Sequence, residues 1–454
     1  MATSQFELAL STDLYELTMA SSYDALGRHG RAVFSLYVRK LPEHRHFLVV
    51  AGVNELLERL VALRFDDETR AYLRTLPMLR PDFVDSLASF RFHGDVWAVR
   101  EGTVIFADEP ILEVEAPIDQ AQLVETLVLN AIHYPTLVAT KAARCRLAAP
   151  GKTLVDFGLR RTPSLEAGLA AARAAYLAGF AATSNVLAGA RYGIPVSGTV
   201  AHSFIESFPS ELEAFRAFAR TYPGDPILLI DTYDTLRGAE HAVIVARELA
   251  AEGRRVRAVR LDSGDLAELS RAVRALLDRS GFPDIQIFAS GGLDEYELHA
   301  LEATGAPIDG YGIGSRLGTS TDAPLADMAY KLVEYDGEPV LKLSTGKRTL
   351  VGAKQVWRRI GRDGHYSEDL IALRDEPPPG PDWIPLLRPV MRGGEILERP
   401  ALPELRAHHQ SEIDRLPPWL RVLAPTATYP VRLSDRLRAR QLQAEETIRR
   451  REGL

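Results

Sequence analysis

The sequence contains a single cysteine, Cys145, among its 454 residues. One cysteine excludes an intrachain disulfide and suits a reducing compartment. No apolar run reaches about 18 residues, and no basic segment followed by an apolar one opens the chain, so we expect neither a membrane span nor a signal peptide. These absences predict a cytoplasmic protein without a membrane partner.

An excess of basic residues is also missing. The formal net charge is −7, from 54 Lys and Arg against 61 Asp and Glu, whereas proteins that bind nucleic acid electrostatically usually concentrate positive charge on one face. We therefore expect no nucleic-acid partner, although a local site can still attract small anions. With 46 % hydrophobic and 25 % charged residues, the composition is typical of a globular protein.

Short apolar runs alternate with helix-like segments through the middle of the chain. The runs are 154–157, 180–183, 194–200, 227–230, 256–261, 285–289 and 308–313. Alternation of strand and helix at this spacing predicts a parallel sheet. Seven such units fit a closed or nearly closed βα barrel better than an open sheet, and we assign this α/β domain to residues 151–329.

The flanking segments follow a different pattern. Residues 1–150 mix predicted helices at 11–20 and 120–149 with short strands, which indicates an α+β domain with a helical connection. Residues 330–454 contain strand-like runs joined by turns at Asp336-Gly337 and Gly346, and they end in a charged helix at 434–451.

Polar residues and glycines follow the C-terminal end of each predicted strand. They are Gly158 with Arg160, Ser184, Thr199 with His202, Asp231 with Asp234, Asp262 with Ser263, Ser290 to Gly292, and Gly314 with Ser315. In a βα barrel these strand ends lie on one face, where active sites are found. Residues distant in sequence are therefore expected to converge there.

His202 stands in the loop Gly198 to Phe208, between a predicted strand and an amphipathic helix. Most single histidines are structural or surface groups, but Thr199 and Ser203 place hydroxyls beside this one and Gly198 leaves room for a ligand. No second histidine lies three or four residues away, so the spacing does not suggest a metal cluster. A general base and a nucleophile both remain open.

Two late loops carry the chemistry expected of a phosphate site. Ser290-Gly291-Gly292 and the loop ending in Gly314-Ser315 offer backbone N–H groups without an obstructing Cβ, and barrels often bind phosphate after their last strands. Arg260 stands two residues before Asp262. This arginine can hold a carboxylate or phosphate, and the aspartate can hold Mg²⁺ with a phosphorylated ligand, although a structural ion pair is the alternative.

Seven ordered motifs resemble one known family. They are TDLYELTMA at 12–20, DFGLRRTPS at 156–164, TSNVLAG at 183–189, GTVAHSF at 198–204, DTYDT at 231–235, VRLDSGDL at 259–266 and YGIGS at 311–315. Their order and approximate spacing resemble nicotinate phosphoribosyltransferase from about Ser11 to Trp357. The resemblance implies a type II phosphoribosyltransferase, with an irregular TIM-like βα barrel and an α+β domain in which residues 330–454 pack back on the N-terminal segment.

The resemblance also implies a reaction. Nicotinate and 5-phosphoribosyl 1-diphosphate would give nicotinate mononucleotide and diphosphate, with coupled ATP hydrolysis, as a step of NAD synthesis. His202 would be phosphorylated by ATP, and a homodimer would share its active sites. By the family pattern, nicotinate would be bound by Tyr15 (reaching in from the second subunit), Arg160, Ser184, Thr199 and Arg260, and phosphoribosyl diphosphate by Asp262, Ser290, Gly291, Gly292, Gly314 and Ser315, with Asp262 near Mg²⁺.

Several alternatives stay open at this point. The helical spacing of Tyr15, taken alone, favours a half-buried core residue over a ligand-binding one. The chain could be a nicotinamide- or quinolinate-type phosphoribosyltransferase, or a non-catalytic regulator on the same fold. The resemblance implies that nicotinamide-using relatives carry an aspartate at the position of Ser184, so a serine here favours nicotinate. Because no cysteine-rich C-terminal segment is present, we expect no structural zinc.

Overall fold

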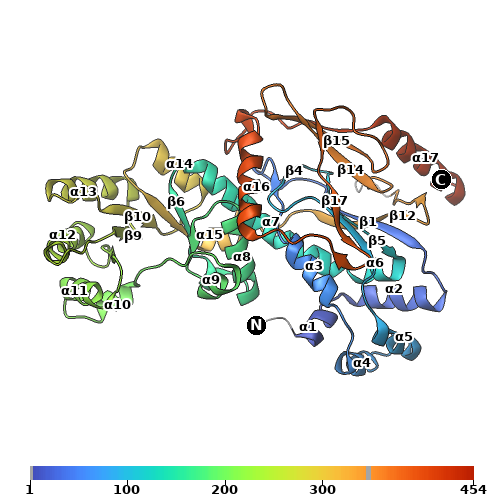
Figure 1. The fold of residues 1–454 in the computed structure, drawn as a ribbon, viewed down its shortest axis with the longest axis horizontal. Helices are drawn as coiled ribbons and strands as arrows, with labels where there is room; N and C mark the ends of the chain where they lie inside the picture. Colours follow the sequence, from blue (N-terminus) through green and yellow to red (C-terminus); the bar gives the residue numbers. More distant parts are fainter. Residues whose placement is uncertain (1–3, 344–348) are drawn as a thin grey trace. The chain divides into compact units, whose positions relative to one another are not determined.

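The computed structural model describes residues 4–343 and 349–454, and the chain divides into two units (Figure 1). The first unit combines residues 1–140 with 325–454, and the second comprises residues 141–324. The first division falls inside helix α7 (Glu125–Ala148), where the sequence pattern had no break to reveal it. No helix among the described residues is both long and apolar enough to cross a membrane.

Both ends of the chain build the main sheet of the first unit. Its seven strands follow the order β13-β12-β1-β5-β3-β17-β18, and all neighbours are antiparallel. The early strands are β1 (Arg31–Val38), β3 (Asp95–Ala98) and β5 (Pro110–Pro117), and the late ones are β12 (Met328–Tyr335), β13 (Glu338–Pro339), β17 (Arg388–Arg392) and β18 (Glu395–Ile396). Pairing of β12 with β1 sets Phe34 against Leu332.

A second sheet and several helices complete this unit. The sheet has the order β16-β14-β15-β19, formed by β16 (Trp383–Pro385), β14 (Lys354–Ile360), β15 (Tyr366–Leu373) and β19 (Val431–Leu433), and β2 (Leu48–Val49) pairs with β4 (Val104–Ile105). The helices are α1 (Gln5–Leu10), α2 (Leu14–Ala25), α3 (Val53–Ala62), α4 (Asp67–Leu73), α5 (Pro81–Ser86), α6 (Ile118–Leu123), α16 (Leu402–Arg415) and α17 (Asp435–Glu452). One apolar core runs from Leu8 to Leu437.

Some local predictions for this unit need correction. The helix predicted at 11–20 begins at Leu14 with Asp13 at its N-cap position, because Ser11 already terminates α1. Of residues 47–53, only β2 (Leu48–Val49) is a strand, since Gly52 adopts φ 100° and starts α3. The turn at Asp336-Gly337 is confirmed: both residues have positive φ, as a tight hairpin turn requires, and join β12 to β13. The turn at Gly346 lies outside the described residues.

The second unit contains the predicted barrel. Its strands are β6 (Thr153–Asp156), β7 (Ala182–Thr183), β8 (Ile227–Leu229), β9 (Ala258–Leu261), β10 (Gln286–Ser290) and β11 (Gly310–Ile313), in the order β7-β6-β11-β10-β9-β8 and all parallel. The last strand, β11, pairs with the first, β6. That pairing curls the sheet round on itself, which confirms an irregular TIM-like architecture.

One predicted strand is absent from this barrel. Residues 194–200 form only an isolated parallel bridge, Val196 to Thr183. The gap that remains toward β8 is spanned by a side chain, because the Thr199 hydroxyl donates to the carbonyl of Ile227 at 2.7 Å. Pro195 and Gly198 explain the irregularity, since proline lacks a ladder N–H and glycine weakens a strand.

Helices follow the barrel strands along the chain (Figure 1). They are α8 (Leu165–Leu177), α9 (Val186–Tyr192), α10 (His202–Glu206), α11 (Glu211–Thr221), α12 (Thr235–Ala251), α13 (Leu266–Arg279), α14 (Glu295–Ala303) and α15 (Ser315–Gly318). Asp234, Asp265 and Asp294 cap the N-termini of α12, α13 and α14 through their side chains. Each cap ends a loop at the C-terminal side of its strand and therefore fixes the loop's length.

Buried charges cross-link the first unit. The guanidinium of Arg358 donates to Asp369 at 2.6 Å and to Glu412 at 3.1 Å, and lies 3.9 Å from Glu109. Tyr429 also donates its hydroxyl to Asp369. Three carboxyl groups thus surround one cation in the interior. Burial, and then the nearby charge of Asp369, hold the pKa of Glu109 well above its ordinary value.

We predict that Glu109→Gln removes a pH-dependent loss of stability. A raised pKa means that the folded state keeps a proton which the unfolded chain releases, so stability is full below about pH 4.5 and falls as pH rises toward the raised value. Between pH 5 and 8, the unfolding free energy of the wild type should fall relative to the variant by about 1.4 kcal/mol per pH unit until Glu109 ionises. Urea denaturation measures this difference.

The matched control is Glu395→Gln, on the exposed edge of β18. Its unfolding free energy should differ from that of the wild type by a constant amount over the same pH range. A similarly constant difference for Glu109→Gln would show that Glu109 is ionised in the folded protein.

Candidate active site

The carboxylate of Asp262 joins side chains from two neighbouring barrel strands. Its Oδ1 accepts a hydrogen bond from Arg260 Nη2 at 2.8 Å and another from the Ser290 hydroxyl. Arg260 Nε also donates to Ser290 Oγ at 2.8 Å. Because β9 and β10 pair in parallel, their C-terminal ends bring these three residues together, as the strand-end pattern predicted.

The charge balance of this group favours an ionised Asp262. Burial raises the pKa of its carboxyl, but the hydrogen bond from Ser290 and the charge of Arg260 together hold that pKa below its ordinary value. Arg260 in turn lies over the Phe157 ring, 5.4 Å from its centroid. The guanidinium is therefore fixed on one side by a carboxylate and on the other by an aromatic face.

Asp231, directly after β8, holds the Asp262 loop from a third strand. Its Oδ2 accepts from the backbone N–H of Asp262 at 3.0 Å and from the Ser263 hydroxyl at 2.6 Å. Its Oδ1 is buried and has no hydrogen-bond partner among the described residues. The sequence pattern placed Asp231 at a strand end without giving it a role, so this contribution was missed.

His202 is the first residue of α10 and lies between a hydroxyl and a carboxylate. Its Nδ1 is 3.1 Å from Thr232 Oγ1, and its Nε2 is 3.8 Å from Asp262 Oδ2. The side chain remains 39 % exposed, so a bound molecule can reach the ring. A contact between Thr232 and His202 was not predicted, because the only signal in the sequence was the position of Thr232 next to Asp231.

The loops after β6 and β7 are tied to a buried carboxyl. Asp156 accepts from the backbone N–H of Gly158 and from the Thr183 hydroxyl, both at 2.7 Å, while its carbonyl accepts from the N–H of Ser184 at 2.8 Å. Burial raises the pKa of Asp156. Ser184 is thereby held at the end of β7, with its own hydroxyl left to the partly exposed surface.

The first and last strands of the barrel bring two further loops together. A Cβ added to Gly158 would lie 3.3 Å from the carbonyl of Gly314, so the backbones approach closely. Arg160 follows in a single 3-10 turn, Leu159–Arg161, and Ser315 opens α15; both side chains are solvent-exposed. The predicted residues of these loops therefore face the same region of the barrel.

Two predicted residues make no hydrogen bond or ion pair with the Asp262 group among the described residues. The hydroxyl proton of Thr199 is engaged with the Ile227 carbonyl, so only its oxygen is left to accept a bond from a ligand. Tyr15 belongs to the first unit, where its side chain is 45 % exposed. Burial, followed by the charge of Glu125, raises the pKa of its hydroxyl, which keeps Tyr15 a neutral hydrogen-bond donor.

Two carboxylate oxygens could hold a metal ion. Among the residues that the structure describes, Oδ1 of Asp231 has no hydrogen-bond partner and Oδ2 of Asp262 has only the distant His202 ring. Within the described ranges no group of three or more possible ligands forms a cluster. Mg²⁺ is commonly held by one or two carboxylates together with substrate phosphates, so these two residues fit that ion.

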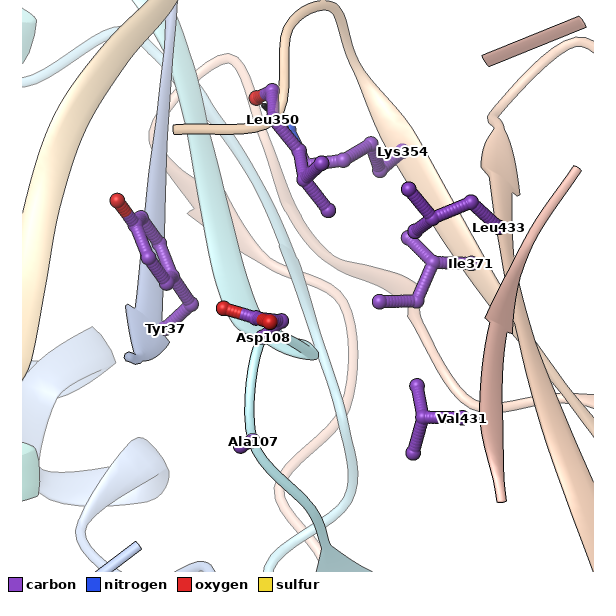
Figure 2. A pocket seen from close by; sticks show the side chains of 8 residues that line it. All are labelled: Tyr37, Ala107, Asp108, Leu350, Lys354, Ile371, Val431 and Leu433. Atoms are coloured by element: carbon purple, nitrogen blue, oxygen red, sulfur yellow. Dashed lines mark hydrogen bonds between the residues drawn. The ribbon is translucent and has the colours of Figure 1, made fainter. Parts of the chain in front are cut away.

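A cavity of about 220 Å³ in the first unit contains none of the predicted site residues (Figure 2). Tyr37, Asp108 and Lys354 contribute its polar groups, and Leu350, Ile371, Val431 and Leu433 much of its apolar wall. The ammonium of Lys354 is already bonded to the carbonyls of Leu350 and Gly352. The cavity is therefore a feature of the sheet packing, separate from the residues at the barrel strand ends.

Models of one protein family match most of the chain. The nicotinate phosphoribosyltransferase N-terminal domain matches residues 10–133, the nicotinate phosphoribosyltransferase family model residues 152–348, and its C-terminal domain residues 381–441. The chain is 50 % identical over 442 residues to the nicotinate phosphoribosyltransferase pncB2 of Mycobacterium tuberculosis (strain ATCC 25618 / H37Rv), covering 96 % of this chain and 94 % of the relative. The chain belongs to the nicotinate phosphoribosyltransferase family.

Two further comparisons agree with membership of the nicotinate phosphoribosyltransferase family. A Bacillus subtilis nicotinate phosphoribosyltransferase is 42 % identical over 380 residues, covering 81 % of this chain and 77 % of the relative. The crystal structure of human nicotinic acid phosphoribosyltransferase superposes with a TM-score of 0.84 at 33 % identity, covering 95 % of this chain and 99 % of that one. The resemblance seen in the seven sequence motifs is thereby confirmed.

Gly291 and Gly292 provide a matched test of the phosphate-loop geometry. Both have positive φ, at 96° and 65°. A Cβ on Gly291 would lie 2.0 Å from the carbonyl oxygen of Asp262, whereas one on Gly292 meets nothing within 4 Å. Gly291→Ala must therefore displace the Asp262 backbone, and Gly292→Ala need only accept backbone strain.

We expect Gly291→Ala to lower kcat/KM for nicotinate mononucleotide formation by about 100-fold, because a displacement near 1 Å at a reacting centre can cost that much. Gly292→Ala should lower it by less than about tenfold. Circular dichroism checks that both variants fold. Equal losses in the two folded variants would contradict the role given to the close approach.

Proposed function

We propose that this chain joins nicotinate to 5-phosphoribosyl 1-diphosphate, forming nicotinate mononucleotide and diphosphate, with ATP hydrolysis coupled through a phosphorylated His202. The observation that carries the proposal is the Asp262 group: a fixed carboxylate bound to Arg260 and Ser290, with His202 3.8 Å away. In a cytoplasmic setting the reaction would serve NAD synthesis.

The transfer needs charge stabilisation and orientation more than acid–base chemistry. As the C1–O bond to diphosphate breaks, positive charge develops on the ribose and negative charge on the leaving group. Mg²⁺, held by Asp262 and Asp231, would supply positive charge to that leaving group. The chain's own part is to fix both substrates in line, which the hydrogen bonds from three strand ends support.

The phosphate of the ribose substrate has two suitable loops. Ser290, Gly291 and Gly292 leave β10, and Gly314 with Ser315 leave β11. Gly291, Gly292 and Ser315 are exposed, and their backbone N–H groups with the Ser315 hydroxyl are the donors that suit a phosphate, whereas the Ser290 hydroxyl is already donated to Asp262. We assign both loops to phosphoribosyl diphosphate.

Nicotinate combines a flat ring with a carboxylate, and the remaining residues suit both parts. Arg260 donates through Nε to Ser290 and through Nη2 to Asp262. Among the described residues its Nη1 has no hydrogen-bond partner, and neither has the exposed guanidinium of Arg160. Ser184 and Thr199 add hydroxyl oxygens. Tyr15, from the second subunit of a homodimer, would stack on the ring.

His202 suits a phosphoryl acceptor because its ring is held yet reachable. Thr232 bonds one nitrogen, and the ionised Asp262 faces the other. A carboxylate beside an imidazole stabilises the cationic ring and orients it. Phosphorylation at this position would place new negative charge beside Asp262 and could reorder the loops that bind substrate.

The direct test is nicotinate mononucleotide formation from nicotinate and 5-phosphoribosyl 1-diphosphate with Mg²⁺, with and without ATP. We expect product from nicotinate, increased by ATP, and none from nicotinamide run in parallel. No product from either base, with folded protein that still binds them, would instead favour a non-catalytic regulator.

His202→Ala separates ATP coupling from the transfer itself. The variant should lose the increase caused by ATP and should bind both substrates more weakly if phosphorylation orders the loops. Loss of ATP coupling with unchanged substrate affinity would contradict the ordering role.

Ser184→Asp tests the choice between the two pyridine bases. A fixed negative charge at the end of β7 opposes the nicotinate carboxylate but can accept from the nicotinamide NH₂. The variant should therefore increase the KM for nicotinate by a factor at least ten times larger than the factor by which it increases the dissociation constant of nicotinamide. Ser184→Ala is the uncharged control. Equal losses for both bases would contradict this account.

A further inference from the structure

A second cavity lies in the second unit, at the N-terminal ends of the barrel strands β9 and β10. Its volume is about 390 Å³, within the range of roughly 300–1,000 Å³ seen for small-molecule sites. Val256 lies just before β9 and Ile285 just before β10, and both line it. The residues assigned to the transfer reaction follow the C-terminal ends of the same strands, so this cavity is separate from their site.

Three arginines within four residues surround this cavity. Arg254, Arg255 and Arg257 all line it, on a chain whose net charge is −7. Arg255 is paired with Asp225 at 2.8 Å, and Asp284 also lines the cavity. Arg257 is exposed and has no ion-pair partner among the residues that the structure describes, so its guanidinium is available to an anion.

The walls of the cavity are held by hydrogen bonds to the backbone. Arg254 donates to the carbonyl of Tyr222 at 3.0 Å. Arg274, from α13, donates to the carbonyls of Phe282 at 3.0 Å and Ile285 at 2.7 Å, which fixes the opposite loop. Arg257 is bonded through its N–H to Pro226 and through its carbonyl to Gln286. The arginine side chains thus project from a fixed frame.

The remaining lining is apolar. Val256 and Ile285 are buried, Phe282 is half-buried, and Ala246 and Ala250 of α12 add small side chains. The small side chains from α12 and the Phe282 ring give this lining an apolar surface, and a flat group that covers it gains by leaving water. A purely ionic ligand would make no use of this surface.

We propose that this cavity binds a phosphorylated small molecule that carries a flat aromatic ring, the chemical class of the nucleotides. Arg257 contacts the phosphate groups, with Arg254 and Arg255 adding positive charge beside them. The ring occupies the apolar wall around Phe282. This site is distinct from the one that uses ATP in the transfer reaction.

Hydrogen–deuterium exchange of the full chain can test the assignment, because it reports where a ligand binds. The probe is ATP, with inorganic diphosphate as the probe that lacks a ring. ATP should slow exchange in segments 222–226, 254–257 and 282–286, and diphosphate should do so only at higher concentration. Arg257→Ala should raise the ATP concentration needed for half of this protection tenfold or more, because the substitution removes a charge-assisted contact.

Arg247→Ala is the matched control, since it removes the same charge from the exposed face of α12 without touching the cavity. It should leave the protection unchanged, and neither variant should alter ATP protection of segments 199–204 and 290–292. Three results would overturn the proposal: no protection of the three segments at millimolar ATP, equal effects of the two variants, or equal protection by ATP and diphosphate. None of these depends on catalytic turnover.

Discussion

The barrel face depends on one carboxylate, that of Asp262. It accepts hydrogen bonds from Arg260 on its own strand and Ser290 on the next, while its backbone N–H is held by Asp231 from the strand before. Three strand ends are thereby joined at a single residue. The second oxygen of that carboxylate, Oδ2, faces His202, whose Nε2 is 3.8 Å away.

The backbone shows why this convergence needs glycine nearby. Gly291 passes the carbonyl of Asp262 so closely that no Cβ would fit, and at the neighbouring strands β6 and β11 a Cβ on Gly158 would lie 3.3 Å from the carbonyl of Gly314. Close backbone contact brings the phosphate-type loops within reach of the fixed charges. Packing at the strand ends and placement of the chemistry are therefore the same structural constraint.

The parallel sheet, its strand ends and the trio of Arg260, Asp262 and Ser290 could be predicted from the sequence, because apolar runs and the polar residues after them are local patterns. The sequence could not show that residues 194–200 fail to form a strand, because pairing there depends on neighbours that are remote in sequence. Thr232 and the clamp by Asp231 were missed for the same reason. The buried cluster around Arg358 also leaves no local pattern, because its members come from separated strands and α16.

The most direct test of the site is a crystal structure of this chain with nicotinate mononucleotide, diphosphate and Mg²⁺. The account predicts the nucleotide phosphate at the loops Ser290–Gly292 and Gly314–Ser315, the metal ion at Asp262, and the pyridine carboxylate beside Arg160 and Arg260. Product bound elsewhere in the barrel, or a metal ion that contacts neither Asp262 nor Asp231, would contradict it.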